Sequence, residues 1–236
     1  MIRVGIDDTD MPDTPGTNQI ARALAAELRP RWRCRLILRH QLLHDPRVPF
    51  TSHNSSASLL FDAGTTASAD DDALFDALRA GILARCADGS DPGLCLARTV
   101  PMSVAAWGAR CRDEIVTQDD ARALARRHGI RLEGLGGTEG GVIGALAALG
   151  LAAGGDHGRV VHQDGVPDDL AGPVPAAEVL ARGVTAFLDA DTGRPARPRV
   201  VDVGKHLRPN VRGGRVVLFV APSGRDDADH VAVRAD

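Results

Sequence analysis

The chain has 236 residues, of which 44% are hydrophobic and 3% aromatic, and its formal net charge is −3. This composition excludes a disordered chain, and the negative charge argues against a globally basic DNA- or RNA-binding protein. Four cysteines are too widely spaced for a zinc knuckle, and no signal peptide or apolar run of bilayer length occurs. We therefore expect a cytoplasmic protein with reduced thiols that binds neither membranes nor DNA.

A short buried strand opens the chain and ends in a cluster of carboxylates. Val4 and Ile6 are apolar at a period of two, and Asp7, Asp8 and Asp10 follow directly. Like charges at close range cost free energy that a divalent cation relieves, and Mg²⁺ combines one or two carboxylates with phosphate oxygens. The cluster therefore indicates a site for Mg²⁺ and a nucleotide. The alternative is a polar turn in which these side chains only cap a loop.

A Pro- and Gly-containing loop connects this cluster to a helix with apolar residues at helical spacing from Ile20 to Leu28. Thr17 lies at or just before the start of that helix. Its hydroxyl group there can donate to a phosphate, cap the helix or become phosphorylated. We include the neighbouring Thr9 and Asn18 among the predicted nucleotide-binding residues.

Strands predicted over residues 35–38 and 57–61 flank a hydroxyl- and amide-rich segment, residues 50–56. Such a segment beside a sheet binds phosphate or ribose, or it forms a turn through its own side-chain hydrogen bonds. A helix with three aspartates at its N-terminus and a strand over residues 94–97 come next. The residues of the segment that we predict to contact the nucleotide are His53, Asn54 and Ser55.

Two helices, over residues 101–112 and 117–128, and a short strand precede a glycine-rich loop that opens an apolar helix at Val142. A loop of this kind presents backbone N–H groups and the positive helix end to an anion. Close helix packing through the glycines is the alternative, which we favour slightly, and both roles are compatible. The predicted anion-binding residues are Gly136, Gly137, Thr138, Glu139 and Gly140.

The last third of the chain begins with a strand near residue 160 and a linker rich in Pro, Gly and Asp at residues 167–175. Valine-rich segments at 200–203 and 216–220 predict a hairpin with a cationic loop. Lys205 in that loop is a candidate phosphate ligand, and a solvated loop is an equally weighted alternative. The acidic tail after Pro222 is expected to be frayed.

Three motifs occur in the same order as in one enzyme family. They are Gly-Ile-Asp-Asp-Thr-Asp at residues 5–10 with Thr17 downstream, Asp-Pro-Arg-Val-Pro-Phe at 45–50, and Gly-Gly-Val-Ile-Gly-Ala-Leu-Ala-Ala-Leu-Gly at 140–150. Together they resemble TiaS, the archaeal agmatidine-forming tRNA-isoleucine 2-agmatinylcytidine synthetase. Longer members of that family continue into an OB-fold and a zinc ribbon that grip tRNA, which we do not expect in this chain.

The resemblance implies an α+β fold: a kinase-like mixed α/β domain that binds ATP and Mg²⁺ over residues 1–100, a ferredoxin-like α+β domain over 101–222, and the tail over 223–236. It implies an enzyme that uses ATP and Mg²⁺ to activate a carbonyl or amide oxygen of a small-molecule or RNA acceptor. A homodimer is compatible with this architecture. The residues that the resemblance makes catalytic are Asp7, Asp8 and Thr17, and those that would bind Mg²⁺ are Asp7, Asp8 and Asp10.

Two other functions stay open from the sequence. One is a non-catalytic nucleotide- or RNA-binding subunit of a split synthetase, which would bind without turnover. The other is a metal-dependent phosphohydrolase, which would use the acidic cluster to cleave phosphate esters without ATP.

Overall fold

A computed structural model describes residues 1–48, 53–63 and 69–235, and the chain divides into two compact units, Met1–Gly154 and Gly155–Asp236. Residues 49–52, which cover the end of the second motif and the start of the hydroxyl-rich segment, lie outside the described residues. None of the helices in the described ranges is long and apolar enough to cross a membrane. The division at residue 154 differs from the boundary after residue 100 that the family resemblance implies.

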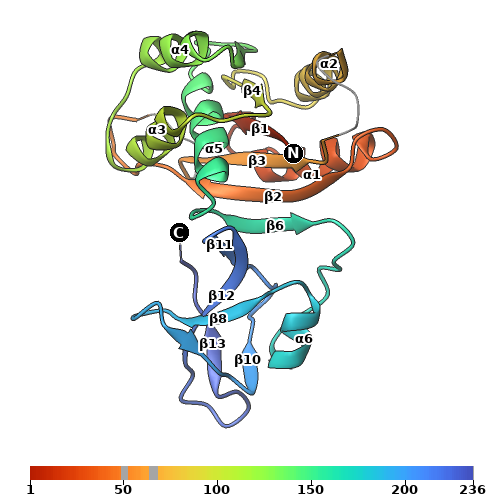
Figure 1. Ribbon diagram of the computed structural model, residues 1–236, viewed down its shortest axis with the longest axis vertical. Helices are drawn as coiled ribbons and strands as arrows, with labels where there is room; N and C mark the ends of the chain where they lie inside the picture. The colour runs from red at the N-terminus through yellow and green to blue at the C-terminus, as the bar shows by residue number, and fades with distance from the viewer. Residues whose placement is uncertain (49–52, 64–68, 236) are drawn as a thin grey trace. The chain divides into compact units, whose positions relative to one another are not determined.

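The first unit contains an antiparallel sheet whose described strands lie in the order β5-β4-β1-β3-β2, and Figure 1 labels β1 to β4. β1 is central because it pairs with both β3 and β4, and Val4 and Ile6 within it are fully buried, as predicted. The strands are β1 (Ile2–Asp7), β2 (Cys34–Gln41), β3 (Ser55–Phe61), β4 (Gly93–Ala97) and β5 (Arg131–Gly134).

Helices cover both faces of this sheet. α1 (Thr17–Leu28) and α2 (Ala69–Leu83) lie on one face, and α5 (Val142–Gly154) crosses β1 and β4 on the other. α3 (Met102–Asp113) and α4 (Gln118–Arg127) pack against α5. The order β1-α1-β2-β3-α2-β4 forms the βαββαβ arrangement of ferredoxin-like folds. That arrangement lies within the range predicted for the kinase-like domain, and the mixed helix and sheet content agrees with the predicted α+β class.

α5 lies so close to the sheet that only glycine fits beneath it. A Cβ atom on Gly5 would lie 1.9 Å from the carbonyl oxygen of Ala145, and one on Gly93 would lie 2.1 Å from that of Gly141. Both distances are far below van der Waals contact, so the two glycines are steric requirements of the helix–sheet packing. Gly5 and Gly93 lie in strands; within the glycine-rich region itself, a Cβ atom on Gly141 would lie 2.4 Å from the carbonyl oxygen of Asp91, whereas one on Gly140 would have no atom closer than 3.5 Å.

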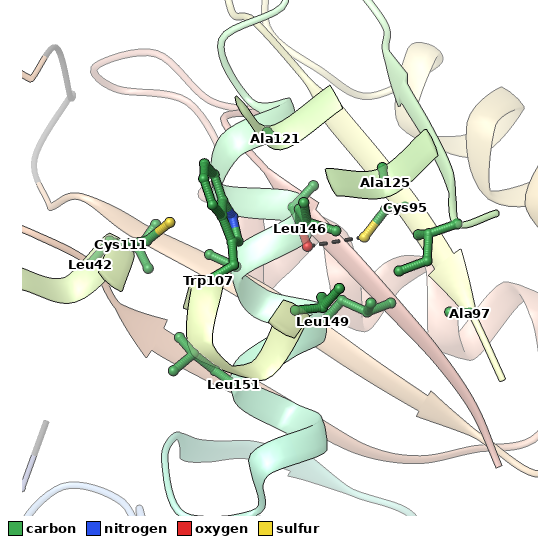
Figure 2. Close-up of a cluster of buried hydrophobic side chains, with 14 residues drawn as sticks. Leu42, Cys95, Ala97, Trp107, Cys111, Ala121, Ala125, Leu146, Leu149 and Leu151 are labelled. Atoms are coloured by element: carbon green, nitrogen blue, oxygen red, sulfur yellow. Dashed lines mark hydrogen bonds between the residues drawn. The ribbon is translucent and has the colours of Figure 1, made fainter. Parts of the chain in front are cut away.

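A buried cluster fills the space between α5, its neighbouring helices and the sheet (Figure 2). Trp107 from α3 packs beside Leu146 from α5, and the Cys95 thiol of β4 donates to the carbonyl oxygen of Ala145 at 3.1 Å. All four cysteines are free thiols, as predicted, although Cys86 is only partly buried. The C-terminal end of α3 is held at the segment after β2, because the carbonyl oxygen of Cys111 accepts from the N–H of Leu43 at 3.0 Å.

The second unit consists mainly of short strands, with β12 pairing antiparallel to β11 and β13 and parallel to β8. β10 pairs with β7 and β13, and β9 pairs with β8. Its elements are β6 (Arg159–Gln163), β7 (Pro173–Pro175), α6 (Ala176–Ala181), β8 (Ala186–Asp189), β9 (Pro195–Ala196), β10 (Val200–Asp202), β11 (Asn210–Arg212), β12 (Arg215–Pro222) and β13 (His230–Ala232).

The predicted hairpin between residues 200–203 and 216–220 is wrong. β12 forms its hairpin with β11, because Gly213 and Gly214 have φ values of 55° and 69° and make a two-residue turn between them. β13 also pairs with β12 and β10, so part of the tail that was expected to be frayed is an ordered strand.

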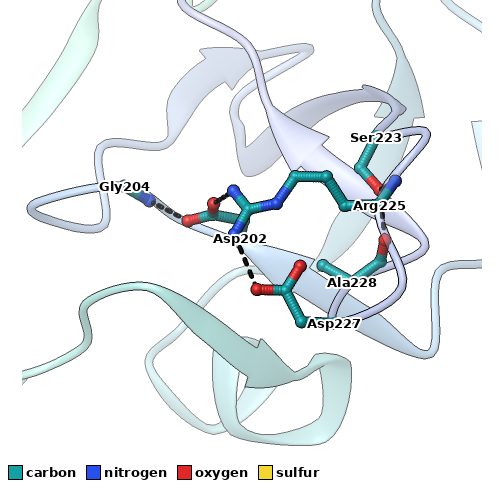
Figure 3. Close-up of polar contacts among 6 residues, drawn as sticks. All are labelled: Asp202, Gly204, Ser223, Arg225, Asp227 and Ala228. Carbon is teal, nitrogen blue, oxygen red and sulfur yellow. Dashed lines mark hydrogen bonds and ion pairs between the residues drawn. The ribbon is translucent and has the colours of Figure 1, made fainter.

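Arginines in this unit are used in internal ion pairs. Arg225 binds Asp202 and Asp227, each through one guanidinium nitrogen at 2.6 Å, and Asp202 also accepts from the backbone N–H of Gly204 at 2.9 Å (Figure 3). Lys205 lies in an exposed turn next to this network. Within the predicted cationic loop, Arg208 pairs with Asp168 at 2.8 Å, so part of the positive charge of the loop is neutralised inside this unit.

Candidate functional site

The strand registers bring five strand ends to one edge of the sheet in the first unit. Asp7 at the end of β1 lies opposite Gly93 at the start of β4, which in turn lies opposite Gly134 at the end of β5. Ser55 at the start of β3 lies opposite Gln41 at the end of β2. The segments that leave this edge, with the start of α5 and the segment after α3, line a cavity of about 280 Å³.

Most of the predicted site residues in this unit line the cavity. Those that do are Asp7, Asp8, Asp10, Thr17, His53, Asn54, Ser55, Thr138 and Gly140. Those that do not are Thr9, Asn18, Gly136, Gly137 and Glu139 from the same unit, and Lys205 from the second unit. Cavity residues that sequence reasoning missed are Leu42, Leu43, Val48, Asp91, Cys111, Glu114, Ile115, Val116, Gln118, Ile143 and Gly144.

Asp7 is partly buried between the end of β1 and the first turn of α5. A Cβ atom on Gly144 would lie 1.8 Å from Asp7 Oδ2, so the helix leaves space for this carboxylate only because residue 144 is glycine. Burial raises the pKa of Asp7 well above its usual value, and the charges of Asp8 and Asp10 add to this effect. A hydrogen bond from the backbone of Asp8 partly opposes the rise.

Asp8 has a left-handed backbone conformation, with a φ of 52°. Such a conformation costs a non-glycine residue about 1 kcal/mol or more and often occurs at functional sites. Burial raises the pKa of Asp8 to about 6, and the nearby charges of Asp91 and Asp10 contribute. Asp91, which precedes β4, therefore belongs to the same group of carboxylates. Asp91 lies in a turn rich in Pro and Gly, and nothing in that local sequence indicated that it would join the carboxylates of β1.

The carboxylates do not form a preassembled metal cage. Within residues 1–48, 53–63 and 69–235, no three His, Cys, Asp or Glu side chains converge closely enough to hold a metal ion. Mg²⁺ often takes only one or two carboxylates and completes its shell with phosphate oxygens and water. Because Asp7 and Asp8 have raised pKa values, a cation would relieve the cost of ionising them. This donor set fits a Mg²⁺ site that a bound nucleotide completes.

Thr17 is the first residue of α1, and its hydroxyl group is held by Asp10 and Thr9. The hydroxyl donates to Asp10 Oδ1 at 2.9 Å, accepts from the Thr9 hydroxyl at 3.1 Å and accepts a longer bond from the Thr9 backbone N–H at 3.5 Å. The backbone N–H of Thr17 also donates to Asp10 Oδ1, at 3.1 Å. The N-cap residue of α1 is Gly16, which makes no side-chain cap hydrogen bond, and Asp10 satisfies the backbone N–H of Thr17 instead. Asp10 also lies where it can accept the hydroxyl proton of Thr17.

The glycine-rich loop already binds an anion, which is the side chain of Asp91. The backbone N–H of Thr138 donates to Asp91 Oδ1 at 2.7 Å, and the Thr138 hydroxyl donates to Asp91 Oδ2. A Cβ atom on Gly137 would overlap the same carboxylate, at 1.6 Å from Oδ1. Glu139 pairs with Arg122. The loop thus uses its donor at Thr138 to hold Asp91, whereas we had predicted a phosphate there.

The segment after the undescribed residues forms another wall of the cavity. The Asn54 amide donates to the carbonyl oxygen of Leu43 at 2.8 Å, and the Asn54 carbonyl accepts from the Leu42 N–H at 2.9 Å. Asn54 therefore fixes the chain that leaves β2, while His53 is exposed at the cavity. Glu114, from the segment after α3, also lines the cavity and adds another carboxylate.

No protein-family model and no curated protein sequence matches the chain. Among solved structures, the TiaS–tRNA(Ile2)–ATP complex has a TM-score of 0.54 and 19% identity, covering 63% of this chain and 36% of that one. A tRNA fluorescent labeling enzyme has a TM-score of 0.53 and 20% identity, and the TiaS–tRNA(Ile2)–AMPCPP–agmatine complex has 0.51 and 19%. Both of these matches cover 63% of this chain and 35% of the other.

This chain thus spans about a third of the length of the solved structures it matches. At these identities the likeness concerns the fold. Over 63% of its length, the chain resembles TiaS, as its sequence motifs predict.

Proposed function

We propose that the first unit is an ATP- and Mg²⁺-dependent phosphoryl-transfer enzyme in which Thr17 accepts the γ-phosphoryl group. The observation that carries this proposal concerns Thr17, which lines the cavity and whose hydroxyl group donates a hydrogen bond to the Asp10 carboxylate. A threonine is a weak nucleophile unless an adjacent base takes its proton. Asp10 supplies that base at 2.9 Å.

In the proposed step, the Thr17 oxygen forms a bond to the γ-phosphorus of ATP while the bond from that phosphorus to the β-phosphate oxygen breaks. ADP leaves, and the Thr17 proton passes to Asp10. Phosphoryl transfer depends mainly on positioning and charge neutralisation. Mg²⁺ held by Asp7 and Asp8 would supply that neutralisation, and the described cavity lining contributes no Lys or Arg side chain for it.

The phosphoryl group would then activate a carbonyl or amide oxygen of an acceptor, because a phosphate ester is a better leaving group than a free oxygen. Solved TiaS structures contain tRNA with ATP, or tRNA with AMPCPP and agmatine, which supports ATP as the donor and RNA as one acceptor class. A small-molecule acceptor is the other class. The expected homodimer and cytoplasmic location stay predictions.

The test is incubation with γ-labelled ATP and Mg²⁺, followed by mass spectrometry of the labelled peptide. We expect label on Thr17, and we expect the label to disappear in Thr17→Val. Thr14→Val is the matched control, because Thr14 is an exposed threonine of the same loop whose hydroxyl donates to the Met11 carbonyl oxygen. That variant should keep the label.

Two outcomes would contradict the proposal and identify another function. Binding of Mg-ATP in calorimetry without label or turnover would indicate a non-catalytic nucleotide-binding subunit. Cleavage of phosphate esters without ATP would indicate a phosphohydrolase. Absence of any nucleotide binding would exclude both the proposal and the first of these alternatives.

A further inference from the structure

We propose that Thr9 is a positioning residue whose hydroxyl group fixes the reactive orientation of Thr17. This inference rests on the proposed function of Thr17 as a phosphoryl acceptor, and it adds a residue that does not line the cavity. Thr9 is fully buried, at 0% exposure, in the turn between β1 and α1. Its backbone is held as well, because its carbonyl oxygen accepts from the N–H of Ala87 at 3.0 Å.

The direction of the hydrogen bonds follows from the chemistry of the three partners. A hydroxyl group has one hydrogen to donate and two lone pairs, whereas an ionised carboxylate can only accept. The single proton of Thr17 therefore goes to Asp10, 2.9 Å away, in a charge-assisted hydrogen bond. The Thr9 hydroxyl, 3.1 Å from the Thr17 oxygen, must then be the donor of that pair.

The tetrahedral Thr17 oxygen carries Cβ, the proton shared with Asp10 and two lone pairs. One lone pair accepts from the Thr9 hydroxyl at 3.1 Å, and the Thr9 backbone N–H lies farther away, at 3.5 Å. The Thr9 hydroxyl is therefore the closer of the two donors that orient this oxygen, and the more weakly engaged lone pair is the one available for bond formation. Without the Thr9 donor, the Thr17 side chain could rotate about χ1 and lose this alignment, and misplaced nucleophiles react more slowly.

Burial of a hydroxyl group is unfavourable unless the group is hydrogen-bonded, and valine has nearly the same shape as threonine. If Thr9 only filled space, valine would therefore serve equally well at this position. The distinction between a positioning role and a space-filling role can be tested with Thr9→Val, which removes the hydroxyl group and keeps the longer hydrogen bond from the backbone N–H of residue 9. Thr9→Ser keeps the donor and removes a methyl group, so it is the matched control.

The first measurement is the single-turnover rate of Thr17 labelling at saturating Mg-ATP, with the dissociation constant of Mg-ATP measured by calorimetry. We expect labelling to slow by about tenfold or more in Thr9→Val, with an unchanged dissociation constant, and to stay near the wild-type rate in Thr9→Ser. Equal rates in Thr9→Val and the wild type would overturn the proposal. Equal slowing in both variants would also overturn it, because it would indicate packing.

The second measurement needs no nucleotide and separates this inference from the proposed function. Three-bond couplings of the Thr17 methyl group in ¹³C-labelled protein report χ1, and we expect one rotamer in the wild type and averaging in Thr9→Val. If the wild type takes no label, the proposed function fails, while these couplings still decide the positioning claim. A single rotamer in Thr9→Val would refute it. If Thr9→Val does not fold, Thr9→Ala provides a second variant without the donor.

Discussion

Replacement of Asp8 by asparagine should stabilise the first unit in a pH-dependent way. Burial and the neighbouring carboxylates raise the pKa of Asp8 from 3.8 to about 6. The unfolded chain releases this proton at a lower pH than the folded chain does. As the pH rises through about 4 to 6, the wild type therefore loses free energy of unfolding. Asp8→Asn cannot titrate, so it gains stability relative to the wild type over the same range.

The size of this gain follows from the shift. One pKa unit corresponds to about 1.4 kcal/mol, so a rise from 3.8 to about 6 sets an upper bound of about 3 kcal/mol. Asp8 is only partly buried, and solvent screening reduces the expected gain to about 1–2 kcal/mol at pH 8. At pH 4, the gain in stability of Asp8→Asn over the wild type should be small.

Urea unfolding at pH 4 and pH 8, followed by tryptophan fluorescence, measures the gain in the relevant unit. The only two tryptophans, Trp32 and Trp107, both lie in the first unit and are buried. Asp13→Asn is the matched control, because Asp13 also has a positive φ, of 67°, but is exposed. Asparagine tolerates this backbone conformation well, and that effect does not depend on pH. An equal gain of Asp8→Asn at both pH values would refute the electrostatic explanation.

Two further predictions concern packing near the site. Gly144→Ala should displace the Asp7 carboxylate and weaken Mg-ATP binding in calorimetry, whereas Gly154→Ala, in the same helix with no atom within 4 Å of its Cβ, should leave binding unchanged. Tight binding by both variants would show that the position of Asp7 is unimportant. Burial raises the pKa of Cys95 to about 12, so a thiol reagent at pH 8 should modify the partly exposed Cys86 in the folded protein and reach Cys95 only after unfolding. Rapid modification of Cys95 in the folded protein would contradict its burial.

Local patterns identified the elements of the first unit well. Alternation of apolar residues located β1, and the aspartates that follow it do lie at the cavity because they end a central strand. The second unit shows where the same kind of reasoning missed a signal. The Gly213–Gly214 pair between two valine-rich segments indicates a two-residue hairpin turn, yet we paired the later strand with the wrong partner.

β1, the carboxylates after it and the threonine that begins α1 could be predicted from local patterns, because each depends on neighbours within a few residues. The place of Asp91 in this cluster and in the glycine-rich loop, and the space that Gly144 leaves for Asp7, could not be predicted in this way. These contacts join segments far apart in the chain, and strand register and the close approach of α5 set which of those segments meet. Neither is encoded in the local periodicity of the chain.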